Sequence, residues 1–371
     1  MENNFKENRI VLFLPTLLGG GAEETFVHLA RYLASKNLNV YLVVGTNKSS
    51  NLYSFEENEN ISLIELNASR LILSFFKLYS TVKKLQPNIL LSTLWYANIL
   101  IYPISKLLKV PLIVREAGSD YRQDNTIKSK IISKTVRYIY SRSNSVISIS
   151  DSLKDDLVKN VGIPVEKLCT IYNPVESYIN RDKLSKIDFK KYFHDSTQNT
   201  KFLITACRLD KVKGLDFLLE SFTFLRDSDI RLLIIGDGGE RENLETLVDT
   251  LDLKNNVKLL SWQDNIYDFI YSCDFYISTS INEGLGNAYL ASKLLNKQSL
   301  CSNIPASLEI NSLFGNGISF DINAVDIGEK IKNISQGYKD NSEVDNDIIN
   351  KFIFETCFKN YLDLINKSIG S

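Results

Sequence analysis

Arg208 and Lys213 are the residues whose types and spacing first suggest chemistry. They lie in the segment CRLDKVKGL, which follows an apolar run at 201–206 and opens a helical pattern at 215–225. An arginine fork and a lysine point charge can converge on a diphosphate above a helix N-terminus. A solvated charged loop is the alternative, but parallel sheets bind their ligands at the carboxyl ends of their strands, which favours a binding site.

A second loop, STSINEGLGN at 278–287, places Glu283 beside two glycines between an apolar run and a helical pattern. A carboxylate can fix sugar hydroxyls, while the bare amides of a glycine-rich turn hold phosphate oxygens. These amides belong to four successive residues, Gly284, Leu285, Gly286 and Asn287. In the alternative interpretation, Glu283 only caps the helix that begins near Asn287.

Three consecutive glycines occur in GGGAE at 19–23, between an apolar run at 9–14 and a helical pattern at 22–35. Such a turn lets the backbone approach a ligand, and the N–H groups of the following helix suit an anion. The segment does not match G-x-G-x-x-G, and no acidic residue follows the second strand to hold a ribose. A turn that only changes the chain direction is therefore an equal alternative.

Short apolar runs alternate with helical patterns through the first half of the chain. This alternation is typical of parallel strands joined by crossover helices, and continuous apolar runs indicate strands buried on both faces. We expect strands at 9–14, 39–44, 89–92, 112–115 and 145–149, helices at 22–35 and 126–142, and a polar loop at 45–60.

The alternation starts afresh after a polar stretch that ends near residue 199. The sequence therefore predicts two Rossmann-like domains, at 1–180 and at 181–345. The last segment, 346–371, has an amphipathic pattern and is expected to form a helix that packs across both domains. Expected strands of the second domain are 201–206, 231–235, 256–260, 275–278 and 298–301, with helices at 215–225, 241–251 and 287–295.

The composition is that of a globular protein with two hydrophobic cores. The chain has 371 residues, 44% hydrophobic and 23% charged, with a formal net charge of -1. A near-neutral balance gives no global case for nucleic acid as a partner. Five scattered cysteines, a polar N-terminus and apolar stretches well short of the ~20 residues of a membrane span predict a cytoplasmic location.

The order of these segments resembles the retaining GT-B glycosyltransferases of glycosyltransferase family 4. The segments that carry the resemblance are GGGAE, NPV, RLDKVKGLDFLLESF, LLIIGDGGERENLETLV, VKLLSW and STSINEGLGNAYLAS. They cover nearly the whole chain, and the likeness is strongest from 201 to 309. The resemblance implies an α/β GT-B fold of two facing Rossmann-like domains with parallel sheets. It also implies an N-terminal acceptor domain at 1–180, a C-terminal donor domain at 181–345, and a C-terminal helix at 346–371 that crosses back to the first domain.

The resemblance also implies roles for the charged residues. Arg208 and Lys213 match the pair that grips the donor's diphosphate and stabilises the charge of the leaving group in place of a metal. Glu283 matches the first carboxylate of a pattern of Glu, seven residues and Glu, where it contacts the donor sugar. The amides of 284–287 match the loop around the sugar and the β-phosphate.

Further positions follow from the same resemblance. Gly20 and Gly21 match the glycine loop that closes on the donor from the other domain. Ser261 and Trp262 lie in a segment that is near the base in similar enzymes. The two Asp-x-Asp patterns, at 227–229 and 345–347, lie outside these candidate loops, and no histidine cluster occurs. Neither a metal nor another cofactor is therefore expected, and the donor itself is a nucleotide diphosphate sugar.

The sequence departs from the family pattern at two places. Ala291 stands where the second carboxylate, which usually holds the ribose, should fall. Its loss should weaken donor binding by about 1 to 3 kcal/mol if the ribose hydroxyls stay unpaired. At the end of the strand 112–115 many members carry a histidine, and this chain has Arg115 and Glu116. Contact of Arg115 or Glu116 with the sugar or acceptor is one expectation, and a salt-bridged strand end is the other.

The sequence indicates less about the acceptor than about the donor, which we expect to be a UDP-sugar. Basic and apolar residues mix in the patterns 70–86 and 126–142, which is typical either of helices on an anionic membrane or of ordinary crossover helices. Peripheral contact with the inner membrane face would imply a lipid-linked saccharide acceptor for capsule, O-antigen or exopolysaccharide.

Three functions are consistent with the sequence. The first is an active retaining hexosyltransferase. The second, motivated by Ala291, is a donor-site-impaired partner subunit that stabilises or directs another glycosyltransferase. The third is a GT-B enzyme of different chemistry, such as a nucleotide-sugar epimerase, which the charged loop at 208–213 and the NEGLG segment disfavour.

Overall fold

The computed structural model describes residues 9–18, 20–46, 60–118, 120–122, 126–315, 317–337 and 345–370. It divides into two compact units. Unit 1 comprises Met1–Pro174 and Phe354–Ser371, and unit 2 comprises Val175–Ile353. The boundaries expected at 180 and 345 lie near these positions. Of the expected loop at 45–60, residues 47–59 lie outside the described residues, as does Gly19 of the glycine segment.

Unit 1 is built on a seven-stranded parallel sheet in the order β3-β2-β1-β4-β5-β6-β7. The central strands are continuous apolar runs that are buried along most of their length, as expected for a sheet covered on both faces. The strands are β1 (Arg9–Leu14), β2 (Asn39–Thr46), β3 (Ile61–Ala68), β4 (Ile89–Thr93), β5 (Leu112–Glu116), β6 (Ser145–Ser148) and β7 (Leu168–Thr170).

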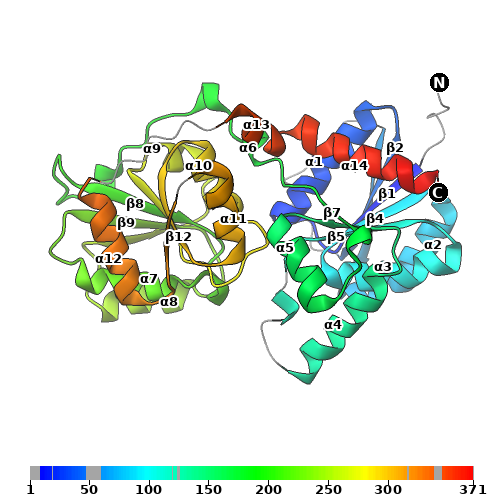
Figure 1. Ribbon diagram of the computed structural model, residues 1–371, viewed down its shortest axis with the longest axis horizontal. Helices are drawn as coiled ribbons and strands as arrows, with labels where there is room; N and C mark the ends of the chain where they lie inside the picture. Colours follow the sequence, from blue (N-terminus) through cyan, green and yellow to red (C-terminus); the bar gives the residue numbers. More distant parts are fainter. Residues whose placement is uncertain are drawn as a thin grey trace. The chain divides into compact units, whose positions relative to one another are not determined.

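Helices cover both faces of this sheet (Figure 1). Apolar side chains of α1 and α14 pack against one face, while α2, α3 and α4 contact one another in sequence on the other. The helices are α1 (Gly21–Ser35), α2 (Phe75–Leu85), α3 (Trp95–Leu108), α4 (Ile127–Tyr140), α5 (Asp151–Asp156) and α14 (Phe354–Ile369), with short turns η2 (Leu71–Ser74), η3 (Asp120–Arg122), η4 (Leu157–Val161) and η5 (Val165–Lys167).

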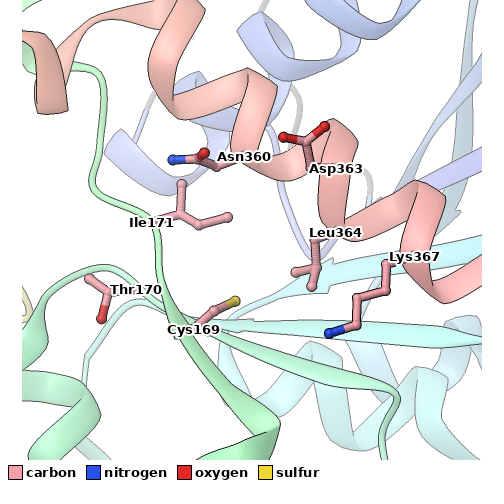
Figure 2. Close-up of a pocket in the computed structure, with 7 residues that line it drawn as sticks. All are labelled: Cys169, Thr170, Ile171, Asn360, Asp363, Leu364 and Lys367. Atoms are coloured by element: carbon pink, nitrogen blue, oxygen red, sulfur yellow. The ribbon is translucent and has the colours of Figure 1, made fainter.

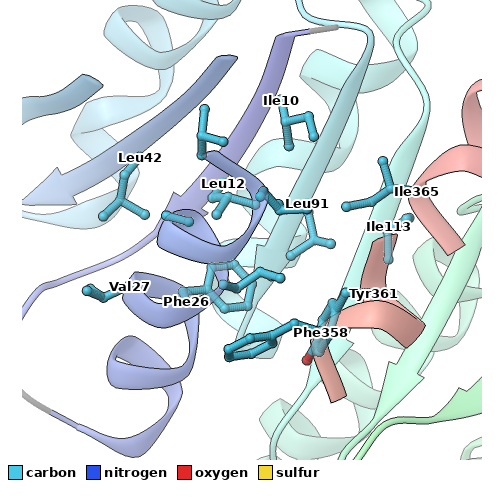
Figure 3. Packing of buried hydrophobic residues seen from close by; sticks show 14 of the residues in the cluster. Ile10, Leu12, Phe26, Val27, Leu42, Leu91, Ile113, Phe358, Tyr361 and Ile365 are labelled. Atoms are coloured by element: carbon cyan, nitrogen blue, oxygen red, sulfur yellow. The ribbon is translucent and has the colours of Figure 1, made fainter. Parts of the chain in front are cut away.

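The last helix, α14, is an integral part of the unit 1 core. Figure 3 shows Phe358, Tyr361 and Ile365 of α14 beside Phe26 of α1 and the apolar side chains of the sheet. The Phe358 ring centroid lies 5.2 Å from that of Phe354 and 6.3 Å from that of Tyr361. The amphipathic pattern at the end of the sequence therefore corresponds to a helix whose apolar side is buried in the core of unit 1.

Unit 2 is built on a six-stranded parallel sheet in the order β10-β9-β8-β11-β12-β13. Together the two parallel sheets confirm the predicted α/β fold of two Rossmann-like domains, and α14 confirms the helix that returns to the first domain. The strands are β8 (Lys201–Ala206), β9 (Ile230–Ile235), β10 (Val257–Leu260), β11 (Phe275–Ser278), β12 (Gln298–Ser302) and β13 (Ile318–Phe320).

Two groups of helices sandwich the second sheet. The apolar sides of α7, α8 and α12 form a core with β8 and β9, and α10 packs beside α9, α11 and β12. No helix among the described residues is both long and apolar enough to span a bilayer. The helices of unit 2 are α6 (Val175–Tyr178), α7 (Leu215–Ser221), α8 (Arg241–Thr250), α9 (Ile266–Ser272), α10 (Asn287–Leu294), α11 (Pro305–Phe314), α12 (Ala324–Ser335) and α13 (Asn346–Ile349), with turns η6 (Arg181–Lys183), η7 (Phe189–Lys191), η8 (Lys211–Lys213), η9 (Phe222–Phe224) and η10 (Asn350–Phe352).

Candidate active site

The topology of unit 2 has a switch point at the carboxyl ends of β8 and β11. Strand β8 pairs with β9 on one side and with β11 on the other, so the sheet grows in one direction after β8 and in the opposite direction from β11 onward. Ligands of open α/β sheets bind outside such a switch point. The loops that follow these two strands are the segments 207–214 and 279–286, which the sequence singled out.

The two loops are packed tightly against each other. Gly214 has a φ of +57°, and a Cβ on it would lie 2.5 Å from the carbonyl oxygen of Thr279. The N–H of Ile281 donates to the carbonyl of Val212 at 2.8 Å, and Thr279 Oγ1 donates to the carbonyl of Lys213 at 2.8 Å. Glycine is therefore required at 214, because any side chain would force the loops apart.

This packing brings Lys213 and Glu283 together. Lys213 Nζ lies 2.5 Å from Glu283 Oε1, and Ser280 Oγ donates to the same oxygen at 2.8 Å. Only 14% of the lysine side chain and 20% of the glutamate side chain are exposed. A partly buried ammonium with a replaceable carboxylate partner is a suitable receptor for a phosphate group, which can take over the role of counter-ion.

Arg208 is placed differently from Lys213. Its Nε pairs with Asp210 of the same loop, and 75% of its side chain is exposed. The guanidinium is thus free of the Lys213 and Glu283 pair but lies in the same loop after β8. Burial raises the pKa of the neighbouring Cys207 thiol to about 12, so this cysteine is no nucleophile at neutral pH.

The glycine-rich loop after β11 leads directly into α10. Gly286 occupies the N-cap position with a φ of +82° and a ψ of 64°, a conformation that favours glycine. Leu285 is buried, and the amides from Asn287 onward form the first turn of α10, which follows this loop. Ala291 lies one turn further on and is completely buried. A carboxylate at that position would be placed in a buried environment.

Ser261 and Trp262 follow β10 at the same carboxyl edge of the sheet. The Trp262 N–H donates to Asp237 Oδ2 at 2.8 Å, and Arg241 Nη2 donates to Asp237 Oδ1 at 2.9 Å. Trp262 is 63% exposed, and its Nε1 donates to Asp264 at 3.2 Å. An exposed aromatic ring on a hydrogen-bonded turn can stack on a flat ligand such as a nucleobase.

Acidification is expected to loosen the turn that carries Trp262. The Trp262 N–H, and then Arg241, hold the pKa of Asp237 below its usual value. A lowered pKa stabilises the folded turn fully above the unfolded value near pH 4, and this stabilisation is lost as the pH falls through the lowered value. We expect the Trp262 emission of a Trp95→Phe variant to shift to the red between neutral pH and about pH 3.

The matched variant Asp237→Asn keeps the size of the side chain but removes its charge. Its emission at neutral pH should already resemble that of the acidified parent protein and should change little on acidification. An unchanged acid transition in this variant would assign the shift to other carboxylates.

In the glycine loop of unit 1, backbone amides already bind a carboxylate of the helix that follows the loop. Helix α1 begins at Gly21, and the N–H groups of Leu18 and Gly20 donate to Glu23 Oε2 at 2.6 and 3.0 Å. Thr16 Oγ1 donates to the other carboxylate oxygen of Glu23. Gly20 has an extended backbone with a φ of -74°. The loop amides predicted to meet a ligand anion thus already hold an internal one, which a ligand would have to displace.

Arg115 lies inside unit 1 and has no exposed surface. Its Nη1 donates to Thr93 Oγ1 at 2.8 Å and its Nη2 to Asn173 Oδ1 at 2.7 Å. Its guanidinium lies 6.0 Å from the centre of the Phe26 ring. The side chain therefore ties β4 and β5 to the segment that leaves the unit. Contact with a substrate would require it to leave these partners.

Glu116 points to the opposite face of the sheet. Tyr140 of α4 donates to Glu116 Oε2 at 2.5 Å, and Asn98 of α3 donates to the Tyr140 hydroxyl at 2.9 Å. Burial, and then the charge of Glu116, raise the pKa of Tyr140 well above its ordinary value. This buried network fixes α3 and α4 to the end of β5. The expected salt bridge at the strand end is absent from the described contacts of Arg115, which binds partners on one face of the sheet while Glu116 binds partners on the other.

A groove of about 400 Å³ lies between β7 and α14 of unit 1. Figure 2 shows Leu364 and Lys367 of α14 above Cys169 of β7. Burial raises the pKa of the Cys169 thiol to about 11, which excludes a thiolate at neutral pH. None of the residues predicted to bind substrate lines this groove. In the part of the chain that the structure describes, no three metal-binding side chains cluster.

Comparison with known families gives one match in each half of the chain. The family model for glycosyl transferases group 1 matches residues 186–351, and the model for Glycosyltransferase Family 4 matches residues 19–177. The first match contains the loops after β8 and β11, and the second contains the glycine loop after β1. The two matches together account for most of the chain.

Individual proteins resemble the chain along most of its length. An N-acetylgalactosamine-N,N'-diacetylbacillosaminyl-diphospho-undecaprenol 4-alpha-N-acetylgalactosaminyltransferase of Campylobacter jejuni is 26% identical over 298 residues, 76% of this chain and 78% of that protein. A glycosyltransferase structure from Rickettsia africae aligns with a TM-score of 0.73 at 19% identity, covering 98% of this chain and 99% of that one. HepE of Anabaena in complex with UDP-glucose aligns with a TM-score of 0.71 at 15% identity, covering 98% of both chains.

Proposed function

Since the chain belongs to the GT-B glycosyltransferases of family 4, we propose that it moves a sugar, with retention of configuration, from a UDP-sugar to a saccharide acceptor. The acceptor is lipid-linked, and the product contributes to a surface polysaccharide. The pathway assignment draws on relatives, among them O-antigen and lipopolysaccharide core glycosyltransferases. The Campylobacter relative, whose name gives a diphospho-undecaprenol acceptor, supports the lipid link.

The observation that carries this proposal is the contact between Lys213 and Glu283 at the switch point of unit 2. The ammonium and the first amides of α10 are suited to the diphosphate, and the carboxylate is suited to a sugar hydroxyl. As the bond between sugar and phosphate breaks, negative charge grows on the leaving oxygen, where Lys213 and the exposed guanidinium of Arg208 stabilise it. A phosphate oxygen helps to deprotonate the acceptor, so the protein positions groups and stabilises charge.

Two observations bear on the base, of which the first favours uridine and the second favours a stacked base of any kind. HepE, which shares the fold, was crystallised with UDP-glucose. In this chain, Trp262 offers an exposed ring on a turn held by Asp237, at the same sheet edge as the phosphate-binding loops. A stacked base and a gripped diphosphate would fix the donor at two points and leave the sugar at Glu283.

The alternative is a partner subunit that binds a donor poorly and directs another glycosyltransferase. The buried Ala291 favours it, since the ribose lacks the carboxylate that usually holds it. Release of nucleotide from UDP-sugars and GDP-sugars without acceptor separates the two functions. A transferase should hydrolyse at least one donor slowly, and this rate should survive EDTA because lysine and arginine replace a metal. Release of no nucleotide from any donor would favour the partner subunit, and loss of the rate in EDTA would contradict a metal-independent mechanism.

One layer of unit 1 has the charge pattern of a surface for anionic lipids. No aspartate or glutamate occurs from 66 to 115 or from 125 to 150, the segments that contain α2, α3 and α4. The same helices expose large apolar side chains, with Phe76 at 81% and Ile127 at 80%. The exposed basic residues are Arg70, Lys77, Lys83, Lys84, Lys106, Lys109, Lys128, Lys130, Lys134, Arg137 and Arg142.

We expect this layer to bind the cytoplasmic face of the membrane peripherally. Exposed apolar side chains next to uncompensated cations insert at the lipid headgroups while the cations meet anionic lipid. Such docking would bring unit 1 to a lipid-linked acceptor. Large apolar side chains that are exposed only to water would lower the solubility of the protein.

Neutralising Lys128, Lys130 and Lys134 to glutamine should weaken binding to phosphatidylglycerol-containing vesicles about 100-fold, at about 1 kcal/mol for each lysine near the surface. Vesicle sedimentation measures the effect. Lys190, Lys254 and Lys332 of unit 2, also exposed, provide the matched control when changed to glutamine. Equal losses in the two triple variants, or equal binding to pure phosphatidylcholine, would argue against a specific membrane-binding layer.

A further inference from the structure

Unit 1 has the same kind of switch point that forms the candidate active site in unit 2. Strand β1 pairs with β2 on one side and with β4 on the other, as β8 pairs with β9 and β11. The segments after β1 and β4 therefore flank one crevice at the carboxyl edge of the sheet. After β4 a single residue, Leu94, separates the strand from α3, which begins at Trp95.

The backbone at Leu94 is unusual for this residue type. Its φ is 74° and its ψ is 128°, whereas the other described non-glycine residues with positive φ lie between 48° and 63° and are all polar. Three hydrogen bonds hold the turn: the Leu94 N–H donates to the carbonyl of Arg115 at 3.2 Å, and the N–H groups of Ala97 and Asn98 donate to the Leu94 carbonyl at 3.0 Å. A strained backbone of this kind persists only where the surrounding structure holds it. Here the strained turn fixes the positions of Trp95 and Tyr96 at the start of α3.

Three aromatic rings meet at this turn. The Trp95 ring centroid lies 5.3 Å from that of Tyr96 in an edge-on arrangement and 5.6 Å from that of Tyr121. Tyr121 is buried, Trp95 is half-buried and Tyr96 is 40% exposed. The exposed tyrosine ring thus stands on a rigid aromatic base at the edge of the sheet, where ligands bind.

The polar groups of the turn suit a neutral ligand. Trp95 Nε1 is buried and donates no hydrogen bond within the described part of the chain. A buried donor without an acceptor is costly, so a hydroxyl that reaches it gains more than an ordinary hydrogen bond. The sequence from 89 to 105 contains no charged residue. Of the cations nearby, Arg115 is held by Thr93 and Asn173. Arg122 is paired with Asp156, so both are already engaged and the turn itself offers no cation to a phosphate group.

We propose that Trp95 and Tyr96 form the binding site for the sugar ring of the acceptor. The Tyr96 ring stacks on the C–H face of a pyranose, and the Trp95 Nε1–H donates to a hydroxyl group of that sugar. This inference rests on the proposed transferase function, because it assigns the acceptor to unit 1 and the donor to unit 2. Specificity for the acceptor then depends on a neutral aromatic site rather than on charge.

The chain offers a direct test because its two tryptophans, Trp95 and Trp262, lie one in each unit. In a Trp262→Phe variant, Trp95 is the only tryptophan, and its emission is titrated with the methyl glycosides of glucose, galactose, N-acetylglucosamine and N-acetylgalactosamine. At least one glycoside should shift the emission saturably, and glycerol should not. Adding Tyr96→Ala should lower the affinity for that glycoside about tenfold, while Tyr96→Phe should leave the affinity unchanged.

The reciprocal variant, Trp95→Phe, reports on unit 2 through Trp262 and is titrated with UDP. If UDP shifts the Trp262 emission but no glycoside shifts that of Trp95, the acceptor site is wrong and the donor site stands. Glycoside affinity that is unchanged by Tyr96→Ala would also overturn the acceptor site. A glycoside shift at Trp95 without a UDP shift at Trp262 would support the sugar site and count against the proposed donor.

Discussion

Replacing Lys213 by alanine is expected to lower kcat/KM for the donor about 10³-fold, or about 4 kcal/mol of transition-state stabilisation. The variant removes the only partly buried cation of the loop after β8 and leaves Glu283 without its ion-pair partner at 2.5 Å. Repulsion between this carboxylate and the diphosphate then adds to the lost attraction. Initial rates of nucleotide release, with and without acceptor, measure the effect.

Lys211→Ala provides the matched control. Lys211 lies in the same 3-10 turn, η8, but its side chain is exposed, so its loss removes the same charge without touching Glu283. We expect its rate to stay within a few-fold of that of the parent protein. A Lys213→Ala rate within tenfold of the parent rate would show that the diphosphate binds elsewhere.

Arg208→Ala should be comparably damaging if its exposed fork swings from Asp210 to the leaving group. Residues that act on one transition-state charge are not additive, so the Arg208→Ala, Lys213→Ala double variant should be little worse than either single variant. Full additivity would indicate that the two cations act at separate points.

The loops of unit 2 could be identified from the sequence because each follows a strand with a continuous apolar pattern. In these two loops, glycine at 214 and at 286 marks positions where the backbone has positive φ. Nothing in the sequence indicated that Lys213 would pair with Glu283 while Arg208 pairs within its own loop. The partner of each cation depends on which carboxylate comes within hydrogen-bonding distance of it. The close contact at Gly214, which brings the two loops together, determines this pairing.

Three strands were not expected from the sequence, and all three lie at sheet edges. They are β3 and β7 in unit 1 and β13 in unit 2. Strand β3 alternates exposed and buried residues, while β7 and β13 have only three residues each. An edge strand needs less apolar cover than a central one, so it lacks the continuous apolar run on which the other predictions depended.

Unit 1 shows where residue type alone misleads. Arg115 and Glu116 were weighed together as a charged strand end, yet successive residues of a strand point to opposite faces. Arg115 therefore joins the α1 face and Glu116 the α3 and α4 face. The Leu94 turn had no signal at all, because leucine in this backbone conformation is exceptional and no glycine or asparagine marks the position.

Replacing Phe358 by alanine is expected to destabilise unit 1 by about 3 to 5 kcal/mol, the usual range for a large aromatic side chain lost from a core. Phe358 is 1% exposed and lies between Phe354, Tyr361 and, at 5.6 Å between ring centroids, Tyr32 of α1. The cavity would detach α14 from the core that it shares with β1 and β4. Urea unfolding followed by Trp95 emission in the Trp262→Phe background should shift by about 1 to 2 M.

Lys359→Ala changes the next residue on the exposed side of α14 and should alter stability by less than about 0.5 kcal/mol. Trp262 emission in the Trp95→Phe background reports the unfolding of unit 2 separately, which matters because two units need not unfold in a single step. If α14 belongs to the core of unit 1, Phe358→Ala shifts the transition seen by Trp95 and leaves that seen by Trp262 in place. A shift of the Trp262 transition alone would mean that the helix stabilises unit 2, contrary to the packing of Phe358 against α1.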